Sequence, residues 1–125
     1  MLDRIDSPPD VMAFRMSGKI SGDDLDSIMD ELDRLMAGTH KVHIFVETRG
    51  IYGIEISRLP SYASRAMPLL GKLDRFGRIA VVADQTWIRL ATRLESLLLP
   101  GISYRTCLPE EREEALAWVC GASDA

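Results

Sequence analysis

Short apolar runs and amphipathic segments alternate along most of this 125-residue chain. Residues 21–38 place leucine, isoleucine and methionine three and four positions apart, which predicts a helix with one buried face. Residues 41–47 form a β-branched apolar run with little alternation, which is typical of a central strand covered on both faces. The same contrast predicts further strands at 78–83 and 102–107 and further helices at 59–73, 85–98 and 109–120.

Turn and capping residues mark the ends of these elements. A Ser-Pro-Pro sequence separates two short strands, predicted at 2–6 and 10–17, because proline fixes φ and has no N–H for a strand ladder. Ser21 and Asp24 are spaced for a capping box at the start of the first helix. Pro68 falls inside a predicted helix and should kink or split it.

The predicted order of elements is ββαβαβαβα over a single domain, residues 1–125. Strand and helix alternate three times after the opening pair, which favours right-handed crossovers and parallel strands. The N-terminal hairpin would supply an antiparallel edge. We therefore expect an α/β fold, with a small mixed, mostly parallel five-stranded sheet and four helices. The segment 48–57, TRGIYGIEIS, is predicted as a strand-to-helix connection that is longer than most.

The composition is that of a soluble globular protein, with 46% hydrophobic and 27% charged residues. No apolar run approaches the ~18 residues of a membrane span, and the acidic N-terminus does not resemble a secretory signal. The two cysteines, Cys107 and Cys120, are expected to be reduced, partly buried thiols. These observations favour a cytoplasmic protein.

The net charge of −4 conceals an uneven distribution. Residues 1–57 carry 6 basic and 11 acidic residues, a balance of −5, and residues 94–125 carry 2 and 6, a balance of −4. Residues 58–93 carry 7 and 2, a balance of +5. This basic island can attract an anionic ligand or an anionic membrane surface, or it can pair with the acidic flanks. Its basic residues are Arg58, Arg65, Lys72, Arg75, Arg78, Arg89 and Arg93.

Patterns that carry catalysis are weak in this chain. RIAVVADQTW, residues 78–87, joins a strand to a helix as many phosphate sites do, but it has no glycine and Asp84 would cap the helix itself. His40 and His43 fall on opposite faces of a strand, which disfavours a metal site. No histidine base lies near a candidate nucleophile. A buried Glu47 would have a raised pKa and has no visible partner in the sequence. We expect neither a cofactor nor an enzyme.

The element order resembles that of STAS domains, the anti-sigma-factor-antagonist fold, and in particular their SpoIIAA-like branch. The resemblance rests on GKISGDDLDSIMDEL at the first helix, on RIAVVADQTWIRLATRL, and on the closing EEREEALAWV, which together span nearly the whole chain. It implies a small cytoplasmic, non-enzymatic α/β module used for regulation or ligand binding. The topology also resembles CRAL-TRIO lipid-transfer domains, in which an apolar ligand lies beneath mobile helices.

A phosphorylation switch is not part of what the resemblance implies here. Regulatory STAS antagonists carry their acceptor serine in an Asp-Ser-Ser-Gly-like motif where the second helix begins. TRGIYGIEIS takes that place in this chain. Ser57 comes too late and has no paired serine, and Thr48 has no motif around it.

Ligand binding is the function class that these observations favour. Ligands of open α/β sheets lie beyond the carboxyl ends of the strands, where the predicted loop 48–57 offers glycines for close approach. The following helix, 59–73, is weakened by Pro68 and would act as a lid. Core packing of Trp87 and a solvated arginine pair on the next helix are the alternatives to a ligand role. The predicted ligand-binding residues are Arg49, Tyr52, Gly53, Tyr62, Met67, Trp87, Arg89 and Arg93.

Two functions remain open from the sequence. The first is a module that binds a small amphipathic or lipid-like anion and associates weakly with an anionic membrane surface. The second is a protein-interaction module, since Leu97, Leu98 and Leu99 cannot all face one core and one of them should be exposed or in an interface. A homodimer is the expected assembly in either case, and nucleic acid is not an expected partner.

Overall fold

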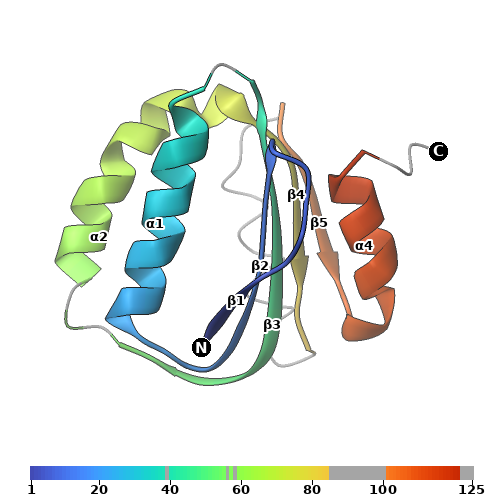
Figure 1. Ribbon diagram of the computed structural model, residues 1–125, viewed down its shortest axis with the longest axis horizontal. Helices are drawn as coiled ribbons and strands as arrows, with labels where there is room; N and C mark the ends of the chain where they lie inside the picture. The colour runs from blue at the N-terminus through green and yellow to red at the C-terminus, as the bar shows by residue number, and fades with distance from the viewer. Residues whose placement is uncertain (39, 56, 58, 85–100, 122–125) are drawn as a thin grey trace.

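The computed structural model describes residues 1–38, 40–55, 57, 59–84 and 101–121. Within them, a five-stranded sheet runs in the order β1-β2-β3-β4-β5 (Figure 1). β1 pairs antiparallel with β2, and the three other pairs are parallel. The mixed, mostly parallel sheet predicted from the sequence is therefore confirmed. Its strands are β1 (Leu2–Arg4), β2 (Val11–Ile20), β3 (Val42–Ile54), β4 (Phe76–Val82) and β5 (Ser103–Cys107).

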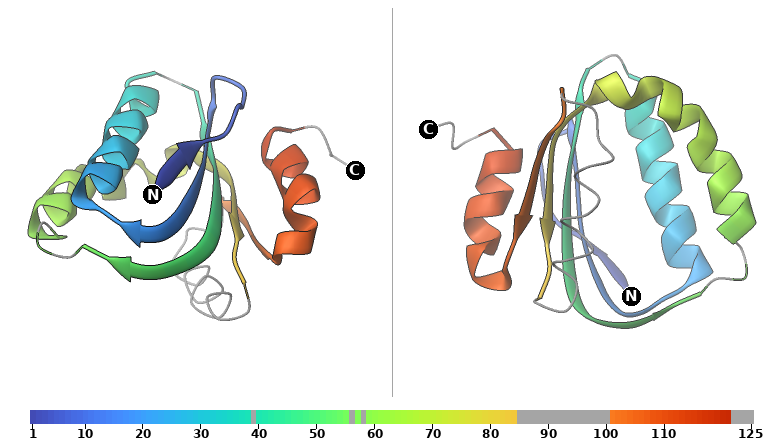
Figure 2. Two further views of the ribbon diagram at one scale, coloured as in Figure 1. Left: turned by 60° about the horizontal axis from the view of Figure 1, so that its bottom comes forward. Right: turned by 180° about the vertical axis from the view of Figure 1, so that it is seen from behind.

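Helices lie on both sides of the sheet (Figure 2). α1 (Gly22–Met36), α2 (Leu59–Ala66) and the 3-10 segment η1 (Met67–Arg75) are on one side. The short 3-10 turn η2 (Pro109–Glu111) and α4 (Arg112–Val119) are on the other. The prediction of four helices is not confirmed, because the described residues contain three α-helices and the predicted 85–98 helix lies outside them. None of the described helices is both long enough and apolar enough to cross a membrane.

Strand alternation divides the apolar side chains between two cores. Met12 and Phe14 of β2 join the core beneath α1, whereas Val11 and Ala13 join the core beneath α4. The core beneath α1 also contains Leu32, Met36, Val42, Phe76 and Ile102. The core beneath α4 also contains Phe45, Ala80, Val82, Cys107, Ala115 and Val119.

The ends of α1 are both satisfied by side chains. The Ser21 hydroxyl accepts a hydrogen bond from the Asp24 N–H at 3.1 Å, and the Asp24 carboxylate accepts one from the Ser21 N–H at 3.0 Å, which confirms the predicted capping box. That backbone hydrogen bond from Ser21 outweighs partial burial and lowers the pKa of Asp24. At the other end, the Arg75 guanidinium donates to the carbonyls of Gly38 and His40 at 2.9 and 2.7 Å. Arg75 also donates to the carbonyl of Met36, the last residue of α1, at 3.4 Å, and this is one of the carbonyls that the end of a helix leaves without partners.

The predicted connection at 48–57 is wrong, because β3 continues to Ile54. Its second half pairs with the end of β2, in a register that joins Ser17 to Arg49 and Lys19 to Gly53. Over that interval β3 advances four residues while β2 advances two, so the ladder is bulged. Gly18 and Gly50 have φ values of 64° and 57°, the left-handed region that glycine enters without strain. Gly50, predicted as a loop residue, is thus a bulge residue in a long strand, and Gly53 pairs with Lys19 directly after the bulge.

Pro68 splits the predicted 59–73 helix, as expected. α2 ends at Ala66, and η1 follows with tighter 3-10 geometry and a non-helical residue at Lys72. A proline inside a helix lacks the N–H for the ladder, and its ring clashes with the preceding turn. The segment therefore consists of two short pieces rather than one continuous helix.

Candidate functional site

The predicted ligand-binding residues lie apart in the described structure. Arg49 lies on the α4 side of β3, where its guanidinium contacts Glu47. Tyr52 is exposed, and its ring lies close to Gly18. Met67 is exposed at the start of η1, on the α1 side of the sheet. These three residues do not line one common cavity among those found in the described residues.

Two of the five other predicted ligand-binding residues lie among the described residues. Gly53 pairs with Lys19 in the bulged part of the sheet, and Tyr62 lies on α2. Trp87, Arg89 and Arg93 lie outside the described residues, as do the three leucines at 97–99.

Three residues of the basic island are engaged within the protein. The Arg65 guanidinium contacts the carboxylates of Asp30 and Asp33 on α1, at 2.9 and 2.8 Å. Arg75 caps the end of α1, and the Arg78 Nε donates to the Val119 carbonyl at 3.1 Å, at the end of α4. Pairing with the acidic flank, one of the two alternatives left open by the sequence, is confirmed for Arg65.

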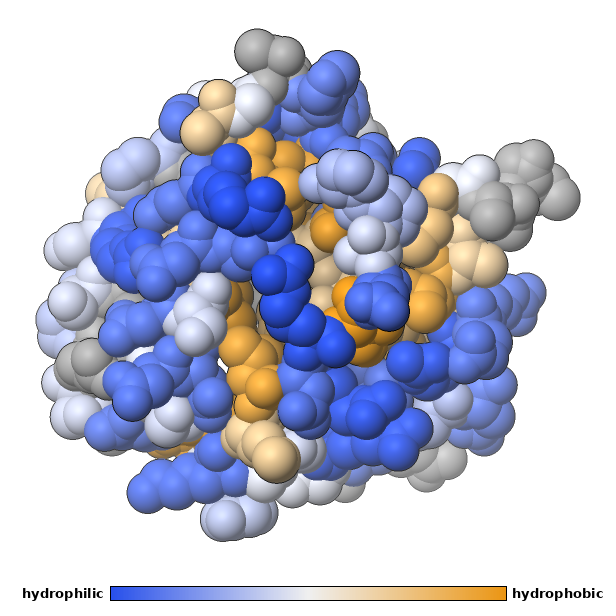
Figure 3. Space-filling view, viewed as in Figure 1, coloured by the Kyte–Doolittle hydropathy of each residue, from blue (hydrophilic) through white to orange (hydrophobic). Residues whose placement is uncertain are grey.

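A cavity of about 380 Å³ lies between α1 and the strands β1 and β2. Its volume falls in the range of ~300–1,000 Å³ that small-molecule sites occupy. Leu2, Met12, Phe14 and Ile28 give it an apolar lining. Hydrophobic residues reach the surface between α1 and β1 in the space-filling view, and hydrophilic residues border them (Figure 3). An apolar recess with a polar border suits an amphipathic molecule.

Three charged residues at the border of this cavity form one ion-pair network. The Arg4 NH2 group lies 2.9 Å from Glu31 Oε2, and the Arg34 NH2 group lies 2.5 Å from the same oxygen. The hydrogen bond from Arg34 and the charge of Arg4 outweigh partial burial, so the pKa of Glu31 lies below its usual value. Two guanidinium groups therefore share one carboxylate, and this network joins β1 to α1 across the opening.

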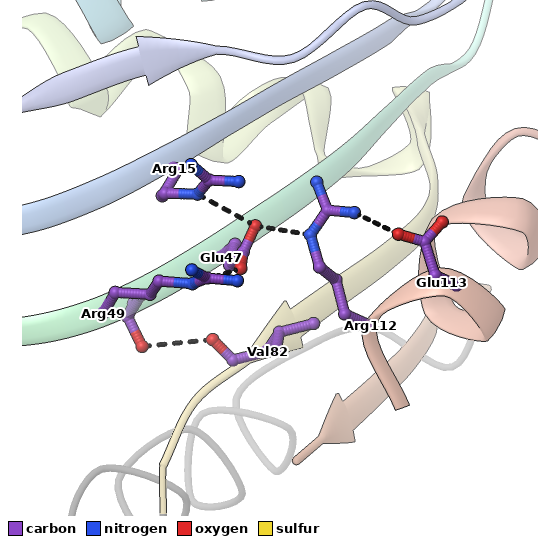
Figure 4. A network of polar contacts seen from close by, with 7 residues as sticks. Arg15, Glu47, Arg49, Val82, Arg112 and Glu113 are labelled. Carbon is purple, nitrogen blue, oxygen red and sulfur yellow. Dashed lines mark hydrogen bonds and ion pairs between the residues drawn. The ribbon is translucent and has the colours of Figure 1, made fainter. Parts of the chain in front are cut away.

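A second network surrounds Glu47 on the opposite side of the sheet (Figure 4). Glu47 is only 1% exposed, and it lies opposite Arg15 on β2 and Val82 at the end of β4. Its Oε1 accepts hydrogen bonds from Arg112 Nε at 2.7 Å and Arg15 Nε at 3.2 Å. Its Oε2 accepts one from Arg49 Nε at 2.8 Å. Three guanidinium groups, from β2, β3 and α4, therefore converge on one buried carboxylate.

The prediction that a buried Glu47 would have a raised pKa and no partner is wrong. Burial does oppose ionisation, but the hydrogen bonds from Arg112 and Arg15 outweigh it and lower the pKa of Glu47. A signal was present in the sequence. Arg15 shares a strand face with Val11 and Ala13, and Glu47 shares one with Phe45. Opposite charges on the apolar faces of two neighbouring strands favour a buried ion pair.

His43 is a structural residue at the start of the same face. Its Nδ1 accepts a hydrogen bond from the Arg78 N–H at 2.8 Å, where the β3–β4 ladder is irregular. A Cβ placed on Gly77 would lie 2.3 Å from His43 Cε1, so the imidazole occupies the space that a side chain would need. Burial and the charges of Arg78 and Lys41 lower the pKa of His43, although Asp10 acts in the opposite direction. The neutral imidazole is therefore the form that fits this position.

The described residues offer little for metal or thiol chemistry. Among them, no three histidine, cysteine, aspartate or glutamate side chains form a group that could hold a metal ion. Cys107 and Cys120 are free thiols. Burial and the nearby Glu111 raise the pKa of Cys107, and burial with Asp10 raises that of Cys120. A thiol is a weak nucleophile when its pKa is raised in this way.

Comparison with known proteins gives a family and a fold. The SpoIIAA-like family model matches residues 11–120. A crystal structure of an uncharacterised protein from the DUF3478 family, with a SpoIIAA-like fold, from Shewanella loihica PV-4 is similar to this chain, with a TM-score of 0.63. The two share 20% sequence identity, and the match covers 96% of this chain and 93% of the other. No curated protein matches the chain.

Proposed function

Since this chain belongs to the SpoIIAA-like family, we propose that it is a non-enzymatic binding module for a small amphipathic anion. The observation that carries the proposal is the apolar cavity of about 380 Å³ between α1 and the strands β1 and β2. This position differs from the place predicted from the sequence, which lay beneath residues 59–73. The ligand class is the same, and the elements that would hold it are different.

The chemistry of the cavity suits an alkyl chain with an acidic headgroup. Burying an apolar chain against Leu2, Met12 and Phe14 contributes roughly 25 cal/mol for each Å² removed from water. Arg4 and Arg34 at the border are 70% and 62% exposed, so both can turn toward a headgroup. These two guanidinium groups already contact Glu31. A carboxylate or phosphate headgroup would bind the donors that they have left.

Titration of the purified full chain with decanoate, by isothermal calorimetry, tests this proposal. Arg34→Glu reverses a charge at the border and should weaken binding by roughly tenfold, since a charge-assisted hydrogen bond contributes about 1.5–3 kcal/mol. Lys72→Glu is the matched control, because it makes the same change of net charge on an exposed residue of η1, away from the cavity. Absence of binding to the wild-type chain, or equal loss in both variants, would contradict the proposal.

A weak membrane association is part of this proposal. Its support is a set of exposed hydrophobic side chains, which comprises Met1, Tyr52, Ile54 and Met67. Co-sedimentation with vesicles of anionic and of neutral lipids measures it, and we expect more protein to sediment with the anionic vesicles. Equal failure to bind either kind would remove membrane association and leave the cavity proposal intact.

A protein-interaction module, assembled as a homodimer, is the second candidate. The observation that favours it is the exposure of Tyr52 and Ile54 together at the end of β3. Exposed apolar residues on a strand end are common contact points between chains. Ile54→Asp should convert a dimer seen by gel filtration with light scattering into a monomer. A wild-type chain that elutes as a monomer at all concentrations would exclude this candidate.

A further inference from the structure

The network around Glu47 carries more positive charge than its carboxylate neutralises. Arg15, Arg49 and Arg112 contribute three positive charges, and Glu47 and Glu113 contribute two negative charges, which leaves an excess of one. Glu113 also contacts Arg112, at 2.6 Å, but its side chain is 86% exposed and is largely screened by water. A single buried ion pair would need only one arginine. The additional guanidinium groups give this part of the protein a positive charge that attracts a second anion.

The hydrogen bonds leave many donors of these arginines unused. Arg15 and Arg49 each contact Glu47 through Nε, and within the described part of the chain their terminal NH groups make no hydrogen bond. A guanidinium group has five N–H donors in a planar fork, so four remain on each. The side chains are 32% and 58% exposed, which leaves these donors accessible from solvent. Figure 4 shows that Arg15 and Arg112 approach the carboxylate from different elements of the fold.

The buried carboxylate gives this array its fixed geometry. Free arginine side chains lose about 2 kcal/mol of rotamer freedom when they are ordered. Here Glu47, held in the sheet at 1% exposure, already fixes one nitrogen of each guanidinium group. An incoming anion would meet donors that are ordered beforehand, which raises affinity by reducing the ordering cost of binding.

The position of the network in the sheet also suits a ligand. Glu47 pairs with Val82, the last residue of β4, and Val82 pairs with Cys107, the last residue of β5. Ligands of open α/β sheets lie beyond the carboxyl ends of the strands. The network is on the α4 side, whereas the cavity of the proposed function is on the α1 side. The two sites are therefore separated by the sheet itself.

We propose that Arg15, Arg49 and Arg112, arranged around Glu47, form a binding site for a phosphate monoester. The excess of positive charge attracts such a group, which carries a charge of about −1.5 to −2 at pH 7. The three oxygens of the phosphate accept hydrogen bonds in several directions, which suits donors that come from different strands and from α4. The monoester belongs either to a soluble metabolite or to a lipid headgroup.

Titration of the full chain with inorganic phosphate, by calorimetry at an ionic strength held constant with sodium chloride, tests this site. Arg49→Gln removes the most exposed of the three guanidinium groups and should weaken phosphate binding by at least roughly tenfold. Arg65→Gln is the matched control, an ion-paired arginine of α2 on the other side of the sheet that belongs to neither site, and it should retain wild-type affinity. Melting temperatures without phosphate verify that both variants are folded.

Binding measurements with other ligands distinguish this phosphate site from the cavity of the proposed function. Decanoate binding should be unchanged in Arg49→Gln, because the cavity on the α1 side is intact. Vesicles containing phosphatidic acid distinguish the two sources of the monoester, since only a lipid headgroup site would bind them and lose that binding in Arg49→Gln. No heat of binding with phosphate for the wild-type chain, or the same affinity in Arg49→Gln as in wild type, would overturn the proposal.

Discussion

The two faces of the sheet are built from the same strands and differ in how deeply their charged residues are buried. On the α1 face a cavity of about 380 Å³ remains, and the carboxylate at its border, Glu31, is 16% exposed. On the α4 face Phe45, Ala80 and Val82 are fully buried, and the carboxylate at the centre of the ion pairs, Glu47, is 1% exposed. Each carboxylate binds more than one arginine, so the difference lies in their burial. Burial determines whether such a network is adjustable or fixed.

The largest expected effect comes from removing the two carboxylates in turn. Glu47→Ala should lower the free energy of unfolding by about 3 kcal/mol, because it leaves three guanidinium groups together at the edge of a core. Glu31→Ala should cost less than about 1 kcal/mol, since its exposed arginines can hydrate. Urea denaturation at pH 7 measures both. Equal effects would show that burial does not distinguish the two networks.

The contribution of Glu47 to the free energy of unfolding should also depend on pH. The pKa of Glu47 is lowered in the folded chain, so its stabilising effect is present above the ordinary carboxyl pKa and is lost as pH falls through the folded value. The stability difference between wild type and Glu47→Gln should therefore shrink below about pH 4.5. A difference that stays constant down to pH 3 would contradict the ion-pair explanation.

Glycine substitutions should show how tightly each side of the sheet is packed. Gly77→Ala places a Cβ 2.3 Å from the His43 ring, which cannot move without losing its hydrogen bond from the Arg78 N–H. We expect a loss of about 2 kcal/mol. Gly71→Ala in η1 has open space and should change stability by less than about 0.5 kcal/mol. Combining Gly77→Ala with His43→Ala should recover part of the loss, and additive effects would exclude the clash.

Enlarging one apolar side chain on each face tests whether the cavity has room that the core around Ala80 lacks. Ala80→Leu adds volume where the side chain is fully buried beneath α4, and it should cost about 1–2 kcal/mol through overpacking. Ile28→Phe adds volume at the cavity and should be nearly neutral in stability. The same Ile28→Phe variant should bind decanoate more weakly. Thermal unfolding and calorimetry measure the two effects, and a large loss of stability in Ile28→Phe would mean that the cavity is not available space.

The sequence predicted the strands and the three described helices because their apolar periodicity and capping residues are local signals. Ser21 with Asp24, and Pro68, act over one helical turn, and both predictions were confirmed. The second half of β3 was missed because Gly50 and Gly53 signal a loop, whereas here they accompany a bulge that depends on pairing with β2. That pairing joins residues far apart in the chain.

The candidate sites were predicted less well, for the same reason. Arg49 was identified for its place after a strand, but its partners Arg15 and Arg112 lie far from it in the sequence. The cavity requires β1 and α1 to come together, and no local pattern in Leu2 or Ile28 indicates that contact. The sequence contained one signal for the Glu47 network. Arg15 and Glu47 each follow an apolar residue on one face of a strand, and their charges are opposite.

The smallest expected effect is the pH dependence of stability that comes from His43 on the α4 face. Burial lowers its pKa, so the unfolded chain binds a proton near pH 6.5 while the folded chain resists it. The stabilising effect of the neutral imidazole is therefore fully present above about pH 6.5 and declines as pH falls below that value. The carboxylates with lowered pKa values, Glu31 and Glu47, lose their contributions only at lower pH. His43→Asn keeps an acceptor for the Arg78 N–H without titrating in this range, so its stability should change less between pH 7.5 and 5.5 than that of wild type. Urea denaturation at the two pH values measures this change. If wild type and His43→Asn lose the same free energy of unfolding between pH 7.5 and 5.5, the packed α4 face tolerates a charged imidazole.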